Sequence, residues 1–298
     1  VINCRCAAIP VPIEDAVAVE GLENIGVQMA GENLTSGLTA ADVASIAATV
    51  GAPKPKPKPR YSGPDQGKGE PLGDYLKRTE HPGYNTWQQL DKMQKEGYDV
   101  GNLEFTKLLQ KDVNLLLTNS SSYSDVWNQV KLNTQRFGKD VKTIVAHEYG
   151  HAIHNQLGWA KKGASTNKIV LKYFEKYQKD LGVGMGGPKI TALKNNLNRN
   201  LKLSSDKFKE LRKKFPNLTD KQFKEYWTDT ADFLGAITRN EVGYGHTNLY
   251  YNSYYKQHAE FLAHAAENYY NGNPVFKAMF PKIYDETIQL WDELIKSI

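Results

Sequence analysis

The amino-acid sequence predicts a mainly helical α+β protein with a small sheet. Apolar residues recur at helical spacing along most of the chain after residue 61, whereas only one stretch has the apolar–polar alternation of a strand. No regular alternation of strands and helices runs along the chain, which argues against a parallel α/β fold. Its 298 residues, of which 40% are hydrophobic and 24% are charged, are sufficient to bury a full hydrophobic core.

The first 60 residues are expected to be a leader and a linker rather than a folded domain. The stretch 7–50 contains no aromatic residue and holds one predicted short helix at 39–48. The stretch 53–60 alternates proline with lysine or arginine, a pattern typical of a hydrated, semi-rigid polyproline II spacer. Because the chain begins with Val1, we expect it to be a fragment or a processed product of a longer protein.

A folded domain is expected from residue 61 to residue 298. One strand is predicted at 122–133, and the helix that follows it has Asp140 as a candidate N-terminal cap and Gly158 as a candidate C-terminal residue. A basic helical insertion is expected at about 160–225. The remaining apolar patterns predict helices at 84–98, 103–117, 165–182, 203–214, 219–237, 256–271 and 276–297.

The charge distribution does not call for a nucleic-acid partner. The formal net charge of +5 is small for 298 residues, although 17 Lys or Arg and 6 Asp or Glu residues lie between Lys161 and Glu225. We interpret this basic region as a solvated helical surface, with a docking surface as the alternative.

The cysteine content argues against a disulfide-stabilised protein, and the hydropathy argues against a membrane-spanning one. Cys4 and Cys6 are the only cysteines, and one intervening residue is too short for an ordinary disulfide. The core is therefore not expected to depend on disulfides, which suits synthesis in the cytoplasm. No apolar run approaches the ~20 residues that a membrane-spanning helix needs, so no membrane partner is expected.

The segment with the clearest chemistry is the pentapeptide His-Glu-Tyr-Gly-His at 147–151. On a helix, His147 and His151 lie one turn apart on the same face, where both can bind one zinc ion. Glu148 directly follows the first histidine and lies beside the metal, where it can take a proton from zinc-bound water and pass it to a leaving amine. Apolar residues flank the motif on both sides, as expected for a helix in the wall of a cleft. These features predict a zinc hydrolase with Glu148 as the catalytic base.

A catalytic zinc ion needs a third protein ligand and an open position for water. The predicted helix at 256–271 offers three candidates, because Glu260, His264 and Glu267 lie on one of its faces. The alanines between them permit another helix to pack closely. The pattern alone leaves the choice among these three residues open.

The pentapeptide and the later segment Ala-Glu-Phe-Leu-Ala-His-Ala at 259–265 resemble the gluzincin peptidases related to the anthrax lethal factor. This resemblance implies a zincin-like metallopeptidase domain in which Glu260 is the third zinc ligand. The metzincin class of zinc peptidases is excluded, because its third histidine would stand at the position of Leu157. The family's acidic residue four positions after the ligand is His264 in this chain, which changes the expected surroundings of the metal.

A second resemblance is to the head morphogenesis (minor head) proteins of tailed phages. The opening sequence Val-Ile-Asn-Cys-Arg-Cys is similar to the closing signature of their Mu-type domain, which would lie mostly upstream of Val1. The segments 232–236, 243–246 and 250–251 are similar to the metallopeptidase-like region of such proteins. This resemblance implies a protein that is associated with a phage head.

Peptide hydrolysis also needs a hydrogen-bond donor for the oxyanion that forms on the scissile carbonyl. The resemblance to the lethal-factor-like peptidases favours Tyr254 or Tyr255, a few residues before the ligand Glu260. His246, in a Gly-Tyr-Gly-His loop, is the alternative donor. The predicted strand at 122–133 stands where zincins carry an edge strand that pairs with extended substrates, which indicates a protein or peptide substrate.

Together these observations predict a zinc-dependent endopeptidase. The expected setting is either a phage or prophage head, with capsid or portal proteins as candidate partners, or a toxin-like role with delivery to a target cell. In both cases the chain is expected in the cytoplasm of the producing cell. The alternative is a structural phage head or assembly protein whose zinc site only joins two helices. A fourth protein ligand such as His264 would favour that alternative, whereas an open water position would favour the enzyme.

Overall fold

The computed structural model describes residues 69–162, 164–251 and 254–298. The predicted helix at 39–48, the proline-rich spacer and the N-terminal cysteine segment lie outside these residues, so the predicted leader stays a prediction. The described part is mainly helical and has a small three-stranded sheet and a two-stranded ribbon, as expected for a mainly helical α+β protein. Within it, no helix has both the length and the apolar character to cross a membrane.

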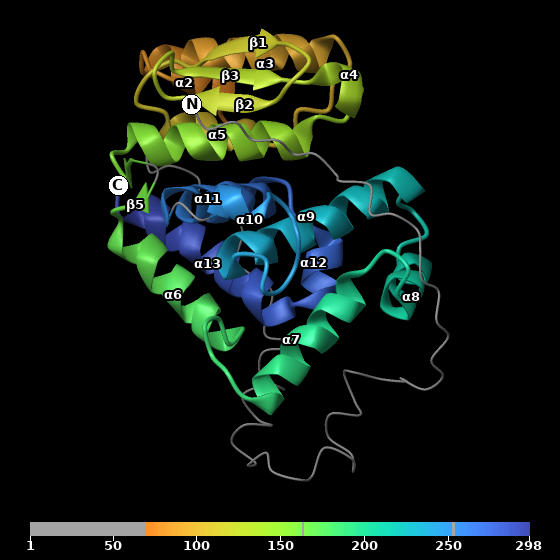
Figure 1. Cartoon of the computed structure of the whole chain (residues 1–298). Coiled ribbons are helices and arrows are strands. Elements are labelled where there is room, and N and C mark those ends of the chain that lie inside the picture. The colour runs from red at the N-terminus through yellow and green to blue at the C-terminus, as the bar shows by residue number, and fades with distance from the viewer. Residues whose placement is uncertain (1–68, 163, 252–253) are drawn as a thin grey trace.

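Helix α5 (Lys142–Gln156) lies between the small sheet and most of the other helices, with α11 (Tyr254–Tyr270) directly against it (Figure 1). Every residue from Ile144 to His154 is buried, so α5 has no solvent-exposed face over this stretch. The chain turns after α5 at Gly158. Its φ of 69° is the left-handed conformation expected of the glycine predicted to end this helix. The other helices are α2 (Leu72–Arg78), α3 (Tyr84–Lys95), the 3₁₀ helix η2 (Leu103–Leu108), α4 (Thr134–Phe137), α6 (Lys168–Asp180), α7 (Pro188–Leu201), α8 (Asp206–Lys214), α9 (Asp220–Thr238), α10 (Asn248–Tyr251), α12 (Pro274–Met279) and α13 (Pro281–Lys296).

A three-stranded sheet covers one side of α5 (Figure 1). Strands β1 (Asn114–Leu117) and β3 (Gln129–Leu132) are parallel, whereas β2 (Ser122–Ser124) is antiparallel to β3 and forms an edge. The strand order is β1-β3-β2, and both β2 and β3 pack against α5. A separate ribbon after α5 consists of β4 (Ala160–Lys161) and β5 (Ala164–Ser165).

The single strand predicted at 122–133 is two strands, β2 and β3, joined by a turn. Asn128 in this turn has a positive φ of 44°, a conformation that asparagine tolerates better than most residues. Its side-chain oxygen accepts hydrogen bonds from the Tyr123 hydroxyl at 3.1 Å and from the Gln156 amide at 2.9 Å. These contacts fix the turn to the end of α5 and leave β2 at the edge of the sheet.

The prediction of a helix at 103–117 is wrong, because the stretch consists of η2 followed by strand β1. Side chains of α3 hold its second half in an extended conformation. Thr86 Oγ1 accepts a hydrogen bond from the Val113 N–H at 2.8 Å. Gln89 Oε1 accepts one from the Leu115 N–H at 3.1 Å. Parallel pairing with β3 then outweighs the helical spacing of the leucines.

The remaining differences between the predicted and the observed helices concern helix ends and one helix that was not predicted. Asp140 does not cap α5, which has no side-chain cap, and its carboxylate instead lies 3.4 Å from the Lys142 Nζ. The helix predicted at 276–297 is two helices, because Pro281 begins a new one. Helix α7 was not predicted, since its asparagine-rich sequence has low helix propensity and buries only Leu201. Helices at 84–98, 165–182, 203–214, 219–237 and 256–271 are confirmed to within about three residues at each end.

Helices α5 and α11 run antiparallel and pack closely. At one end of the contact, the Asn271 side chain donates a hydrogen bond to the carbonyl of Lys142 at 2.8 Å. In the middle, a Cβ added to Gly150 would lie 2.9 Å from the Ala266 Cβ and 3.0 Å from the Ala263 Cα. The small residue inside the pentapeptide therefore allows the two helices to approach each other.

We expect Gly150→Val to lower the free energy of unfolding by about 1–3 kcal/mol, because rigid carbons of α11 occupy the space that the new side chain needs. Urea denaturation of the chelator-treated protein measures this change. Gly186→Ala is the matched control, since an added Cβ there meets no atom within 4 Å. Equal stability of Gly150→Val and the wild type would contradict the close α5–α11 contact.

Candidate metal centre

Six ionisable side chains from α5 and α11 meet inside the protein. None is more than 7% exposed. Burial of so many ionisable groups is costly unless they pair with one another or bind a metal ion, and such clusters are typical of functional sites. The six side chains are His147, Glu148 and His151 from α5 and Glu260, His264 and Glu267 from α11.

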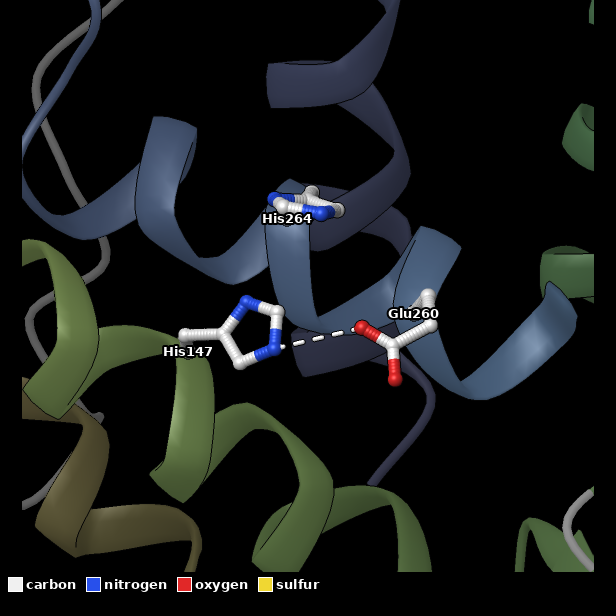
Figure 2. A group of neighbouring side chains, drawn as sticks. All are labelled: His147, Glu260 and His264. Atoms are coloured by element: carbon white, nitrogen blue, oxygen red, sulfur yellow. Dashed lines mark ion pairs between the residues drawn. The ribbon is translucent and has the colours of Figure 1, made fainter. Parts of the chain in front are cut away.

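Three of these side chains bring their ligand atoms close together. The Nε2 atoms of His147 and His151 are 3.2 Å apart. Glu260 Oε2 is 3.3 Å from the Nε2 of His147, and Glu260 Oε1 is 3.8 Å from the Nε2 of His151. Figure 2 shows the contact between His147 and Glu260 as a dashed line that joins α5 to α11. Two imidazole nitrogens and one carboxylate are thus near enough to share one metal ion.

A second group could also hold a metal ion. His147, Glu260 and His264 have ligand atoms that all lie within 4.8 Å of one another. Both ring nitrogens of His264 face carboxylates, however: Nδ1 is 3.2 Å from Glu267 and Nε2 is 3.8 Å from an aspartate of α9. In Figure 2, His264 lies on the Nδ1 side of His147, away from the contact with Glu260. The shorter distances therefore favour the group that contains His151.

Electrostatics holds two of these three side chains in forms that can bind a metal. Burial alone would raise the pKa of Glu260, but the contacts of its carboxylate with His147 at 3.3 Å and with His246 at 3.6 Å hold that pKa well below its ordinary value. Burial lowers the pKa of His151 to about 3, so its ring is neutral at pH 7. For His147, burial would lower the pKa, but contacts with Glu260 and Glu267 raise it well above its ordinary value. Metal binding at His147 would therefore release a proton.

Glu148 lies next to this group but has a different environment. Its side chain is fully buried, and neither carboxylate oxygen has a hydrogen-bond partner among the described residues. Burial raises the pKa of Glu148 to about 8, against the lowering effect of the nearby His147. The Tyr123 backbone also approaches the carboxylate and lowers the pKa, although the geometry falls short of a hydrogen bond. A carboxyl group with a pKa near neutral pH can both accept and donate a proton.

Helix α5 also carries a buried histidine outside this cluster. His154 is 1% exposed, and burial lowers its pKa to about 3. In the unfolded chain a histidine has a pKa of about 6.5, so below that pH the unfolded chain binds a proton that the folded protein does not. The stability that depends on neutral His154 is therefore fully present above about pH 6.5 and is lost as the pH falls toward 3.

Between pH 7 and pH 5, we expect the unfolding free energy of the metal-free wild type to fall by about 2 kcal/mol more than that of His154→Gln, which cannot titrate. Urea denaturation of chelator-treated protein at the two pH values measures the difference. Removal of metal beforehand separates this effect from the loss of metal in acid. An identical pH dependence in the two proteins would mean that folded His154 is already protonated at pH 5.

His246 and Tyr250, which precede α11 in the chain, both contact Glu260. The Nε2 of His246 is 3.6 Å from Glu260 Oε2. The Tyr250 hydroxyl donates a hydrogen bond to Glu260 Oε1, and its ring stacks on that of His246 with the centroids 4.0 Å apart. The candidate His246 therefore lies at the site, and Tyr250 lies there as well.

The other two candidate oxyanion donors, Tyr254 and Tyr255, have side chains outside the described part of the chain, so their roles stay predictions. Tyr250 is one of several suitable donors in the tyrosine-rich segment before Glu260, but the resemblance to the lethal-factor-like peptidases favoured Tyr254 or Tyr255, so it was not selected. Asp232 on α9, which contacts His264, was also not selected. The predicted site residues His147, Glu148, His151, Glu260 and His246 are brought together by the fold.

No family model, curated protein or solved structure matches this chain. The resemblances to gluzincin peptidases and to phage head proteins therefore stay predictions. The functional conclusion depends on the geometry and chemistry of the site itself.

Proposed function

We propose that the protein is a zinc-dependent endopeptidase that hydrolyses peptide bonds with an activated water molecule. The main support is the arrangement of two histidines and an ionised carboxylate around one point, with a buried carboxyl group next to them. His147, His151 and Glu260 hold the metal, and Glu148 is the catalytic base.

Zinc is the metal that suits these three ligands. Zinc–nitrogen and zinc–oxygen bonds of ~2.0–2.2 Å in a tetrahedral site place the ligand atoms about 3.3–3.6 Å apart. The two histidine Nε2 atoms are 3.2 Å apart, and the Glu260 carboxylate lies 3.3 Å from His147 through Oε2 and 3.8 Å from His151 through Oε1. Two histidines and one glutamate are also a known ligand set of catalytic zinc, which keeps a fourth position open.

Besides the three ligands, the proposed reaction uses Glu148 and His246. When bound, zinc acts as a Lewis acid that makes water more acidic and polarises the scissile carbonyl. Glu148 takes the proton from the attacking water and delivers it to the nitrogen of the leaving amine. Burial raises the pKa of Glu148 to about 8 in the metal-free protein, and the charge of a bound zinc ion would lower it, so that the carboxylate could accept the proton near neutral pH. His246 supplies a hydrogen bond to the oxyanion from the side of Glu260.

An extended protein or peptide is the substrate class that fits strand β2. This strand pairs with β3 on one side, and no described strand pairs with its other side. Its three residues are buried in this structure, so a substrate would have to displace what covers them. The backbone of Tyr123 in β2 approaches Glu148. A peptide that pairs with this edge through its backbone would therefore place its scissile bond near the base.

The biological setting is proposed from the sequence resemblances alone. A phage or prophage head protein would act on capsid or portal proteins, whereas a toxin-like protein would act on a protein of the target cell. Both settings use the same peptidase chemistry and differ only in the substrate.

A structural zinc site is the second candidate function. The three ligands are at most 2% exposed. His246 Nε2 lies 3.6 Å from Glu260 Oε2, which is close enough for His246 to be a fourth ligand. Four protein ligands would close the site and leave no position for water. In that case the metal would only join α5, α11 and the loop before α11.

Zinc content and hydrolysis of casein test the peptidase. We expect one zinc per chain, loss of hydrolysis after chelation, and recovery when zinc is added back. His246→Ala separates the two candidates: loss of an oxyanion donor lowers hydrolysis about 10²–10³-fold with zinc retained, whereas loss of a fourth ligand weakens zinc binding. A wild-type protein that holds zinc and cleaves no substrate favours the structural site, and one without zinc contradicts both.

A further inference from the structure

Behind the ligand His147, a chain of buried polar side chains leads away from the metal site. The Nδ1 of His147, the ring nitrogen that does not face Glu260, is 2.5 Å from Glu267 Oε1. Glu267 lies two turns after Glu260 on α11 and is 7% exposed. The short distance is that of a strong hydrogen bond between an imidazole and a carboxylate.

His264 contacts the same carboxylate from a second side. Its Nδ1 is 3.2 Å from Glu267 Oε1, and its Nε2 is 3.8 Å from Asp232 Oδ1 on α9. The ring of His264 also lies edge-to-face with that of His147, with the centroids 4.8 Å apart. His264 therefore bridges a carboxylate on its own helix and one on α9.

Asp232 is in turn held in place by the segment before α11. The Tyr251 hydroxyl donates a hydrogen bond to Asp232 Oδ1 at 3.2 Å. A Cβ added to Gly245 would lie 1.8 Å from the same oxygen, so the missing side chain at Gly245 lets the loop approach this carboxylate. The position of Asp232 thus depends on contacts outside α5 and α11.

We propose that Glu267, His264 and Asp232 are positioning residues, which fix the orientation and tautomer of His147 and thereby set the affinity of the metal site. None of the three binds the metal. A carboxylate that accepts the Nδ1–H of a ligating histidine directs its Nε2 toward the metal and makes it a stronger ligand. His264 restricts the rotation of Glu267, and Asp232 restricts that of His264. Their role depends on the proposed zinc site but not on peptidase activity.

The role of His264 distinguishes the proposed arrangement from the alternative in which His147, Glu260 and His264 bind the metal. As a positioning residue, it acts only through Glu267, so its effect disappears when Glu267 is changed. As a ligand, it would act on the metal directly, and its effect would add to that of Glu267. The coupling between the two residues therefore gives a result that a general loss of stability would not imitate.

Zinc affinity, measured by competition with a chromophoric chelator, tests these roles without an activity assay. Glu267→Gln is expected to weaken zinc binding about 10–100-fold. His264→Leu is expected to weaken it less, and the double variant is expected to bind zinc as Glu267→Gln does. His264→Gln keeps an N–H donor toward Glu267 and is expected to bind nearly as the wild type does. Glu293→Gln, which alters a carboxylate that contacts Tyr173 and Lys172, is the control.

Unchanged zinc affinity in Glu267→Gln would overturn the proposed roles while leaving the zinc site intact. Additive losses in the double variant, or a changed visible spectrum in the cobalt-substituted His264→Gln protein, would make His264 a ligand and would also overturn them. A wild type that binds no zinc would overturn the proposed function as well. Thermal unfolding of each chelator-treated variant identifies any that fails to fold, in which case His264→Gln and His264→Leu still decide the role of His264.

Discussion

Glu148→Gln is expected to lower the rate of casein hydrolysis by about 10²–10⁴-fold and to leave the zinc content unchanged. Glutamine has nearly the same shape as glutamate but cannot accept the proton of the attacking water. Glu148 also lies outside the closely spaced ligand atoms of His147, His151 and Glu260, so its replacement removes no ligand. The turnover rate and the zinc content of the same preparation measure the two effects.

The matched control for this variant is Glu175→Gln, which changes an exposed glutamate on α6. It is expected to keep the full rate of hydrolysis. Full activity in Glu148→Gln would exclude Glu148 as the base. Loss of zinc together with activity would instead mean that Glu148 holds the metal, since a base that is not a ligand does not affect zinc content.

The parts of the fold that depend on local sequence could be predicted, whereas those that depend on distant partners could not. Helices α9 and α11 were expected because apolar residues recur at helical spacing in their sequences, although α11 is buried on every side from Ala259 to Tyr270. Strand β1 was expected to be helical, since the partners of its backbone, Thr86, Gln89 and β3, lie far away in the sequence. Helix α7 was missed although Ile190, Leu193, Leu197 and Leu201 are at helical spacing, because the asparagines between them lower its helix propensity and it buries only Leu201.

The same distinction applies to the site. His147 and His151 could be predicted as a pair because the spacing within one helix fixes which side chains share a face. The same rule selected Glu260, His264 and Glu267 as candidates for the third metal ligand but could not decide among them. The ranking depends on how α11 packs against α5, which brings Glu260 to the Nε2 of His147 and Glu267 to its Nδ1. No pattern in the sequence specifies this packing.

Glu260→Gln is expected to weaken zinc binding by about 10²–10³-fold. Zinc sites with four ligands have binding free energies of ~10–16 kcal/mol, so one ligand accounts for about 3–4 kcal/mol. The amide of glutamine is neutral and binds zinc weakly in place of a carboxylate that is held ionised by His147 and His246. Competition with a chromophoric chelator measures the change, and Glu241→Gln, which alters a carboxylate that contacts Lys194, is the control.

Comparison of Glu260→Gln with His264→Gln determines which of the two groups of three side chains binds the metal. If His147, His151 and Glu260 are the ligands, only the first variant loses affinity, because His264 lies on the opposite side of the His147 ring. If His147, Glu260 and His264 are the ligands, both variants lose affinity and His151→Ala keeps it. A metal held by His147, Glu260 and His264 would lie toward Asp232 of α9, which His264 faces, and would leave out one of the two histidines on which the proposed mechanism depends. The peptidase mechanism therefore requires the first result.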